Sequence, residues 1–399
     1  MSSLDQARVV LGVTGGIAAY KAIEVSRRLV DAGAHVIPVL TEGAERFVGR
    51  VTFDALASEK VQSSLWDEQS PIPHTKLGQS ADLVIVAPAT ARLLADYRMG
   101  RSDDLLTATL IATRAPVLLA PAMHTEMWEH PAVQDNLAVL ASRGVHIVEP
   151  ESGRLAGGDL GHGRLSDPAT IVTHAERVLS TRDLEGLHVV VTAGGTREPI
   201  DPVRVISNRS TGKQGYALAE AAWARGAQVT LISTADLPAP VGVAIVNVET
   251  AAQMQGAVAD VATADVIIMA AAVADFRPAD PAQEKIKKGA GEVPRIELEK
   301  THDFLVDLGA SKPSGQILVG FAAETQNLLE NARGKRERKN LDLIVANDVS
   351  AANAGFAHDT NKVTLILSSG EERDVPFGSK RSVADAVFDA IVDVRTSSH

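Results

Sequence analysis

Residues 189–204 read VVVTAGGTREPIDPVR and residues 206–213 read ISNRSTGK, and these two runs decide the fold of the second half of the chain. An apolar run typical of a β-strand enters a glycine turn. A second loop, rich in serine, threonine and glycine, then opens an alanine-rich helix that we expect from about Gln214 to Arg225. Free N–H groups and the positive end of the helix dipole meet at such a helix start and attract anions. The stretch therefore predicts an anion-binding site.

A shorter version of the same arrangement stands near the N-terminus. Residues 9–21 read VVLGVTGGIAAYK, so an apolar run again passes through a glycine loop into a helix. The loop from Gly12 to Gly16 is not the GxGxxG pattern, and by itself it fits a tight structural turn as well as a phosphate site. Two such starts in one chain indicate two nucleotide-type sites, and hence two activities.

Composition narrows the class of protein. A chain of 399 residues exceeds the usual size of a single core, which predicts two domains. With 45% hydrophobic and 22% charged residues and no apolar run of ~18 residues, we expect a cytoplasmic enzyme without a membrane partner. The absence of cysteine excludes disulfides, thiolate nucleophiles and cysteine-bound metals. The formal charge of −11 argues against nucleic-acid binding, although basic patches lie near residues 285–288 and 333–339.

Strand and helix patterns alternate through both halves. In the first half we expect strands near 8–13, 35–40, 82–87, 116–120 and 145–148, and helices near 17–32, 89–98, 103–113, 132–143 and 168–180. In the second half we expect strands near 188–193, 228–232, 243–247, 265–270, 316–321 and 342–346, and helices near 213–225, 250–262, 326–340 and 380–394. The alternation predicts two doubly wound parallel-sheet α/β domains, the first flavodoxin-like and the second Rossmann-like. A polar joint places their boundary near 182–187, giving domains 1–182 and 187–399.

Small polar groups follow several strands of the first half. Thr41 follows the second strand, Pro88, Ala89 and Thr90 follow the third, and residues 121–123 follow the fourth. Carboxyl ends of parallel strands meet at one edge of the sheet, where ligands bind.

Residues 152–165 hold five glycines and predict either a plain flexible loop or a mobile flap. Residues 276–295 break the alternation in the second half, as a functional loop would.

Two histidines are open to more than one interpretation. His74 lies in a proline-led approach to a short helix, and it is either an ordinary packed or solvated histidine or a positioned acid/base. His124 follows the fourth strand and fits either simple packing beside Trp128 or the edge of a pocket. The pair His124 and His130 lacks supporting carboxylates, so we do not interpret it as a metal site.

Positively charged side chains in the second half of the chain could bind a triphosphate. Lys335 and Lys339 are four residues apart and share one helical face, and Lys285 follows a strand end by a short loop. Charge runs of this kind are also common as solvated faces. Placed opposite an anion-binding helix start, they would suit a triphosphate and its metal, with Asp275 as a ligand of Mg²⁺ or of a sugar hydroxyl.

The motifs, in their order along the chain, resemble a known family. Residues 12–21, 87–90 and 121–123 resemble flavin-dependent cysteine decarboxylases. Residues 192–199, 207–213, 285–288 and 319–325 look like phosphopantothenate–cysteine ligase. Together they resemble the bifunctional bacterial enzymes of coenzyme A biosynthesis over essentially the whole chain. The resemblance implies an FMN-dependent phosphopantothenoylcysteine decarboxylase in 1–182 and a CTP-dependent ligase in 187–399.

For the ligase half, the resemblance implies that CTP activates 4′-phosphopantothenate as an acyl-cytidylate and that the amine of L-cysteine then displaces CMP. It implies catalytic roles for Lys285 and for Asn208, which handles the acyl-cytidylate, and Asp275 would hold Mg²⁺. The residues it assigns to the CTP site are Asp275, Lys285, Thr301, His302, Asp303, Phe304, Phe321, Lys335 and Lys339.

For the decarboxylase half, the resemblance implies that FMN oxidises the cysteinyl thiol to a thioaldehyde, because a simple cysteine carboxylate has no electron sink for the carbanion left by CO₂. His74 maps onto the family's catalytic histidine. The residues assigned to the flavin loops are Thr14, Gly15, Gly16, Thr41, Ala87, Pro88, Ala89, Thr90 and Ala122. The resemblance also implies a homo-oligomer with trimeric decarboxylase contacts and dimeric ligase contacts.

The chain departs from the family pattern at several points. The usual Pro-Ala-Met-Asn ends in His124, the usual Asn-Asp-Leu is residues 103–105 (DDL), and the usual Asn-Pro is Thr301-His302. The flap cysteine that normally protonates the ene-thiol aligns with Gly157, so water, His162 or His124 must deliver that proton if the half is active. The alternative is therefore an active ligase fused to a flavin-binding domain that has lost its catalytic activity. A two-domain NAD oxidoreductase is disfavoured, since neither half has GxGxxG followed by an acidic residue.

Overall fold

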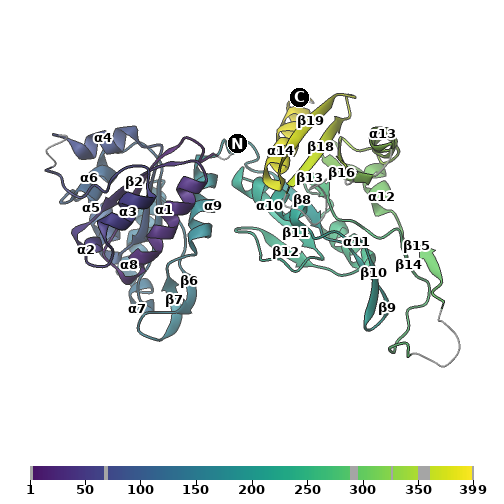
Figure 1. Cartoon of the computed structure of the whole chain (residues 1–399), viewed down its shortest axis with the longest axis horizontal. Helices are drawn as coiled ribbons and strands as arrows, with labels where there is room; N and C mark the ends of the chain where they lie inside the picture. The colour runs from purple at the N-terminus through teal and green to yellow at the C-terminus, as the bar shows by residue number, and fades with distance from the viewer. Residues whose placement is uncertain (1–2, 67–70, 288–294, 325–326, 349–359, 398–399) are drawn as a thin grey trace. The chain divides into compact units, whose positions relative to one another are not determined.

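The computed structural model describes residues 3–66, 71–287, 295–324, 327–348 and 360–397. The chain divides into two compact units, Met1–Thr181 and Arg182–His399, which we call unit 1 and unit 2 (Figure 1). Among the described residues, every helix is too short or too polar to cross a membrane.

Unit 1 contains a five-stranded parallel sheet in the order β2-β1-β3-β4-β5. This is the flavodoxin-like strand order, and it confirms the fold expected for the first half. The strands are β1 (Arg8–Val13), β2 (His35–Leu40), β3 (Leu83–Ala89), β4 (Val117–Pro121) and β5 (His146–Ile147). The helices are η1 (Ile17–Tyr20), α1 (Lys21–Asp31), α2 (Glu42–Glu45), α3 (Arg50–Leu56), α4 (Pro73–Ser80), α5 (Ala91–Met99), α6 (Leu105–Ala112), α7 (Thr125–Trp128), α8 (Pro131–Ser142) and α9 (Pro168–Leu179).

Both faces of this sheet are buried, because β1 and β2 are apolar after their first residue and β3 and β4 are apolar throughout. Side chains alternate across a strand, so Val9 and Leu11 join the core beneath α1 and α9, and Val10 joins a second core on the opposite face. The second core contains leucines of α5, α6 and α8, the helices that cover that face. The sheet thus holds its carboxyl edge rigidly between two helix layers.

The glycine-rich segment expected as a loop or flap is a β-hairpin. Strands β6 (Glu151–Arg154) and β7 (Leu160–Arg164) pair antiparallel, with a turn between them. The sequence did not predict this pairing, because five glycines are an unusual composition for strands. The structure gives the physical reason for two of them, Gly161 and Gly163, which is close approach to a neighbouring loop, described below.

Unit 2 contains an eight-stranded sheet in the order β12-β11-β8-β13-β16-β17-β18-β19. The first six strands are parallel, which confirms the doubly wound part, whereas β18 and β19 run antiparallel at one edge and were not predicted. The strands are β8 (His188–Ala193), β11 (Gln228–Ser233), β12 (Ala244–Asn247), β13 (Val266–Met269), β16 (Ile317–Glu324), β17 (Leu343–Asp348), β18 (Thr360–Leu367) and β19 (Glu372–Ser379).

Five helices flank this sheet, and two small hairpins extend from it (Figure 1). The helices are α10 (Lys213–Ala224), α11 (Ala251–Asp260), α12 (Phe304–Ala310), α13 (Leu328–Arg338) and α14 (Lys380–Ser397). The hairpins pair β9 (Arg197–Asp201) with β10 (Arg204–Ser207), and β14 (Phe276–Pro278) with β15 (Leu298–Lys300). The functional loop expected at 276–295 begins with β14, and its residues 288–294 lie outside the described residues.

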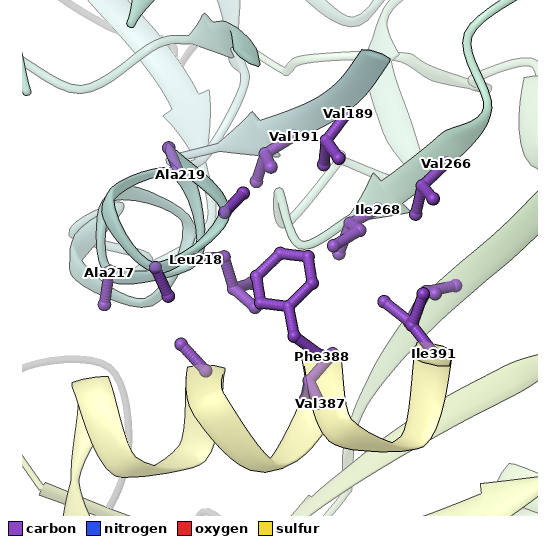
Figure 2. Close-up of a cluster of buried hydrophobic side chains, with 14 of the residues drawn as sticks. Val189, Val191, Ala217, Leu218, Ala219, Val266, Ile268, Val387, Phe388 and Ile391 are labelled. Carbon is purple, nitrogen blue, oxygen red and sulfur yellow. The ribbon is translucent and has the colours of Figure 1, made fainter. Parts of the chain in front are cut away.

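The main core of unit 2 lies between the sheet and two helices. Figure 2 shows Phe388 of α14 among side chains of α10, β8 and β13, including Leu218, Val191 and Ile268. The Phe388 side chain is fully buried, and the guanidinium carbon of Arg225 lies 5.9 Å from its ring centroid. The C-terminal helix is therefore an integral part of the domain that carries the second site.

Replacing Phe388 by alanine should destabilise unit 2 by about 3–5 kcal/mol, because a large buried ring is lost and the packed helices cannot fully close the cavity. Hydrogen exchange at the β8 amides, followed with increasing urea, measures this loss locally. Phe377→Ala on β19 is the matched control, because Phe377 is already 54% exposed and its loss leaves no buried cavity. Equal effects of the two substitutions would contradict the core assignment.

Candidate active sites

The predicted flavin-contacting residues of unit 1 come together at the carboxyl edge of its sheet. The Thr14 hydroxyl donates to the carbonyl of Pro88 at 2.7 Å, and the backbone N–H of Thr90 donates to the Thr14 hydroxyl at 3.2 Å. The Thr41 hydroxyl donates to the carbonyl of Val13 at 3.3 Å. The loops after β1, β2 and β3 are thus tied to one another or to a strand end by threonine hydroxyls.

The fourth loop and the glycines complete this edge. The N–H of Ala122 donates to the carbonyl of Ala89 at 3.2 Å, so the loop after β4 lies against the loop after β3. A Cβ on Gly15 would stand 2.7 Å from the backbone of Gly43, which only glycine avoids. Helix α5 begins here, and its first turn is capped by the Thr90 hydroxyl. Backbone N–H groups and a helix dipole at a sheet edge suit a phosphate-bearing ligand.

His74 lies in the first turn of α4 and is half-buried. Its Nδ1 is buried without a hydrogen-bond partner among the described residues. A buried imidazole nitrogen without a partner is costly unless a ligand or water satisfies it. The hydrogen bonds of the described residues do not connect His74 to the four loops.

His124 stands at the start of α7 between two carboxylates that the sequence did not predict. Its Nδ1 is hydrogen-bonded to Glu126, and its Nε2 lies 3.2 Å from Oδ2 of Asp159 in the β6–β7 turn. Hydrogen bonds to Glu126 and Asp159 hold the pKa of His124 above its ordinary value. The indole of Trp128 contacts His162 of β7, with 5.5 Å between the ring centroids.

Unit 2 contains a cavity of about 710 Å³ over the carboxyl edge of its sheet. Nine predicted site residues line it, namely Asn208, Asp275, Thr301, His302, Asp303, Phe304, Phe321, Lys335 and Lys339. These residues come from segments spread over more than 130 positions of the chain, and the fold brings them together at one place. A second cavity of about 320 Å³ shares Asn208 and the loop 209–211 with the first.

Two threonines of the 192–199 motif, which do not line the larger cavity themselves, hold the loop that forms one of its walls. The hydroxyl of Thr192 accepts from the N–H of Ala271 at 3.1 Å, and that of Thr196 accepts from the N–H of Ala274 at 2.9 Å. They fix the loop that ends in Asp275, whose carbonyl accepts from the N–H of Thr301 at 2.9 Å. The motif thus positions the Asp275 loop from the neighbouring strand.

Asn208 lies across this loop. Its Nδ2 donates to the carbonyls of Ala272 and Val273 at 3.3 and 3.2 Å. Close packing beneath it requires glycine, because a Cβ on Gly195 would stand 2.7 Å from the carbonyl oxygen of Asn208. The helix expected after this loop is confirmed as α10, and its N-cap Gly212 has φ +80°, in the left-handed region.

Lys335 of α13 and Lys339, the residue that caps its C-terminus, also line the cavity. Lys335 Nζ donates to the carbonyl of Phe321 at 2.8 Å, and Lys339 Nζ donates to Oδ1 of Asp303 at 2.7 Å. Two lining side-chain atoms, Oγ1 of Thr301 and Oδ1 of Asn347, are buried without a partner among the described residues. Cations beside unsatisfied polar atoms suit a charged ligand with many oxygens.

Lys285 is not among the residues that line the cavity. It is exposed on a loop held to the β9–β10 hairpin, where Ile286 N–H donates to Oδ2 of Asp201 at 3.2 Å and Arg204 donates to the Ile286 carbonyl at 2.9 Å. Lys288 of the same basic run lies outside the described residues.

Sequence reasoning missed several polar residues of the cavity, including Asn347, Asn361 and Lys380. Lys380 is only 7% exposed, and its carbonyl accepts from Nε2 of Gln214 at 3.1 Å. Nδ2 of Asn361 donates to Oε1 of the same glutamine at 3.2 Å. Asn347 was detectable, because it follows an apolar strand run. Asn361 lies in β18, a strand that was not predicted, whereas Lys380 begins α14, a helix that was predicted without a role at the site.

Comparison with known proteins defines the class. Residues 1–180 match the family model described as Flavoprotein, and residues 184–394 match the model of the DNA/pantothenate metabolism flavoprotein C-terminal domain. A chain with a flavodoxin-like flavoprotein unit followed by this second unit is a two-domain flavoprotein of pantothenate metabolism.

The chain belongs to the family of coenzyme A biosynthesis bifunctional proteins. It is 51% identical to the protein of that name from Mycobacterium tuberculosis strain H37Rv, covering 96% of each chain, and 48% identical to the one from Bacillus subtilis strain 168, covering 97% of each. A solved C-terminal domain of such a protein covers 54% of this chain and 100% of its own, at 40% identity and a TM-score of 0.47. The prediction of a bifunctional ligase and decarboxylase is confirmed.

Proposed function

We propose that unit 2 joins 4′-phosphopantothenate to L-cysteine with CTP, and that unit 1 decarboxylates the product to 4′-phosphopantetheine with FMN. The observation that carries this proposal is the convergence of nine motif residues around the 710 Å³ cavity of unit 2. The convergence of the predicted flavin loops at one sheet edge supports the second step.

In the ligase unit, the substrate carboxylate would attack the α-phosphorus of CTP, forming an acyl-cytidylate as pyrophosphate leaves. The cysteine amine would then form the amide as the bond to CMP breaks. Lys335 and Lys339 would neutralise the triphosphate, and Asp275, exposed at the cavity, would hold Mg²⁺. The unsatisfied atoms of Thr301 and Asn347 would bind the nucleotide's polar groups. Asn208 would bind the acyl-cytidylate.

In the decarboxylase unit, the residues at the sheet edge fit FMN. Gly15 permits the close backbone approach and the α5 start offers free N–H groups, as a flavin phosphate requires. The flavin would supply the reversible two-electron oxidation that creates an electron sink for CO₂ loss. His74, with its unsatisfied buried Nδ1, would act as the positioned acid/base.

We also propose a cytoplasmic homo-oligomer, with trimeric contacts through the decarboxylase unit and dimeric contacts through the ligase unit. Large apolar side chains of unit 1 that remain exposed support the first contact. They include Ile17, Tyr20, Trp66 and Ile72, each more than half exposed.

Two half-reactions test the proposal directly. The purified protein should be yellow, and pyrophosphate release should require both CTP and 4′-phosphopantothenate, with ATP a poor substitute. Synthetic phosphopantothenoylcysteine should release CO₂ without CTP. Loss of CO₂ release with retained flavin would favour the impaired-scaffold alternative and leave the ligase proposal standing.

Lys285→Gln should slow acyl-cytidylate formation about 10²-fold, because a cation facing the phosphates acts mainly on the charge-rich transition state. Lys285 does not line the cavity while Ile286 is hydrogen-bonded to Asp201 and Arg204, so its role requires that this loop move when CTP binds. The measurement is the rate of pyrophosphate release, with Lys287→Gln, an exposed neighbour, as control. An unchanged rate in Lys285→Gln would rule out its catalytic role.

A further inference from the structure

The β6–β7 hairpin is fitted closely against the loop that follows β4. The N–H of Met123 donates to the carbonyl of Gly163 at 2.9 Å. A Cβ on Gly161 would stand 2.1 Å from Oγ1 of Thr125, and one on Gly163 would stand 2.2 Å from the carbonyl oxygen of Met123. These glycines let the hairpin lie directly on residues 123–125, beside the predicted flavin contact Ala122.

His124 fills the space next to the position where related enzymes would carry a flap cysteine. A Cβ on Gly157 would stand 3.5 Å from Nε2 of His124 and 3.1 Å from Oδ2 of Asp159. The imidazole is therefore within contact distance of any side chain at residue 157. A cysteine thiol at residue 157 and the imidazole of His124 would therefore place their acidic hydrogens at nearly the same position.

The surroundings of His124 raise the pKa of its ring. Glu126 on α7 binds Nδ1, and Asp159 in the hairpin turn faces Nε2 at 3.2 Å. Both carboxylates favour the imidazolium form, in which both ring nitrogens carry a proton. The side chain is 37% exposed, which leaves the ring open to a ligand at this edge. A histidine whose pKa is raised above the ordinary value is a better proton donor near neutral pH than a free histidine.

We propose that His124, held by Glu126 and Asp159, is the acid that replaces the flap cysteine in the final step of decarboxylation. The inference rests on the proposed function of unit 1. Loss of CO₂ leaves an ene-thiolate with a nucleophilic carbon. The Nε2–H bond of His124 would break as its proton forms a C–H bond at that carbon, giving a thioaldehyde and a neutral imidazole. A bound, reduced flavin would supply the hydride that the thioaldehyde carbon needs, and water would reprotonate the imidazole of His124.

The other candidate histidines are less suited to this role. Nδ1 of His162 is engaged with the hydroxyl of Ser152 at 3.1 Å, and its ring contacts Trp128. Nδ1 of His130 accepts from the N–H of Ala132 at 3.2 Å, which caps α8 and requires an unprotonated nitrogen. His130 therefore serves as a matched control, because it is an exposed histidine six residues away without a catalytic assignment.

The test is a single turnover of the FMN-loaded enzyme with phosphopantothenoylcysteine. His124→Gln should bleach the flavin and release CO₂ at the wild-type rate, then reoxidise the flavin about 10²-fold more slowly. Mass spectrometry should detect the ene-thiol, two hydrogens short of the product. Adding Gly157→Cys to His124→Gln should restore fast reoxidation, and His130→Gln should resemble wild type.

A second readout is independent of turnover. NMR titration of the flavin-free protein should give His124 a pKa above the ordinary 6.5, and Asp159→Asn should lower it. The Asp159→Asn enzyme should then lose fast reoxidation at lower pH than wild type, because a donor with a lower pKa deprotonates earlier as pH rises.

Three results would overturn the proposal. The first is wild-type reoxidation in His124→Gln, which excludes proton donation. The second is slowed CO₂ release in that variant, which assigns His124 to substrate binding instead. The third is a His124 pKa at or below 6.5. If the wild-type enzyme itself releases no CO₂, the proposed function of unit 1 fails, and this inference fails with it.

Discussion

His74→Asn should retain FMN but lose CO₂ release by about 10³-fold, the typical scale for removing a positioned acid/base. The imidazole lies in the first turn of α4, and its Nδ1 is buried without a partner among the described residues. Asparagine preserves a polar side chain of similar reach but cannot exchange a proton near neutral pH. Flavin absorbance reports binding, and trapped CO₂ reports the chemistry.

Lys76→Gln is the control for this experiment, because Lys76 is exposed on the same helix two residues later. It should leave CO₂ release within about twofold of wild type, since isolated surface charges have small effects. A His74→Asn enzyme that releases CO₂ at the wild-type rate would exclude His74 from the reaction.

Asn208→Asp should separate the two steps of ligation. The amide of Asn208 donates to two backbone carbonyls, so a carboxylate there would face the oxygens of Ala272 and Val273 with no proton to offer. It would also repel the phosphate of an acyl-cytidylate. We expect pyrophosphate release to continue while capture by cysteine slows about 10²-fold, with the intermediate detectable by mass spectrometry.

Asn208→Ala distinguishes loss of the donor from addition of a charge. It should slow capture less than Asn208→Asp, because it removes the hydrogen bonds without adding repulsion. If both variants slow pyrophosphate release and capture equally, Asn208 acts on the fold of the cavity wall and has no separate role in the second step.

The parallel strands were predictable from sequence, because strands buried on both faces are continuously apolar and glycine loops mark their carboxyl ends. The edge strands β18 and β19 were missed although their signal was present. Residues 360–367 and 372–379 flank the turn Ser368-Ser369-Gly370-Glu371, which is typical of a hairpin. An alternating pattern of strands and helices does not contain two consecutive strands, so this hairpin was not predicted.

The functional sites were likewise only partly predictable from the sequence. The motif residues of unit 2 surround one cavity because they stand at strand ends or on α13, where topology alone brings them together. The position of Lys285 depends instead on contacts of its loop with Asp201 and Arg204, which no local sequence pattern predicts. The Asp159 partner of His124 was equally hidden, since it arises from glycines that let a hairpin approach a distant loop.

The measurement that tests the central claim most directly uses L-cysteine labelled in its carboxyl carbon. The account predicts labelled CO₂ and 4′-phosphopantetheine when the purified protein receives this cysteine together with 4′-phosphopantothenate, CTP and Mg²⁺, and no labelled CO₂ when either CTP or 4′-phosphopantothenate is omitted. Accumulation of labelled phosphopantothenoylcysteine without CO₂, from protein that carries its flavin, would contradict the claim that one chain performs both steps.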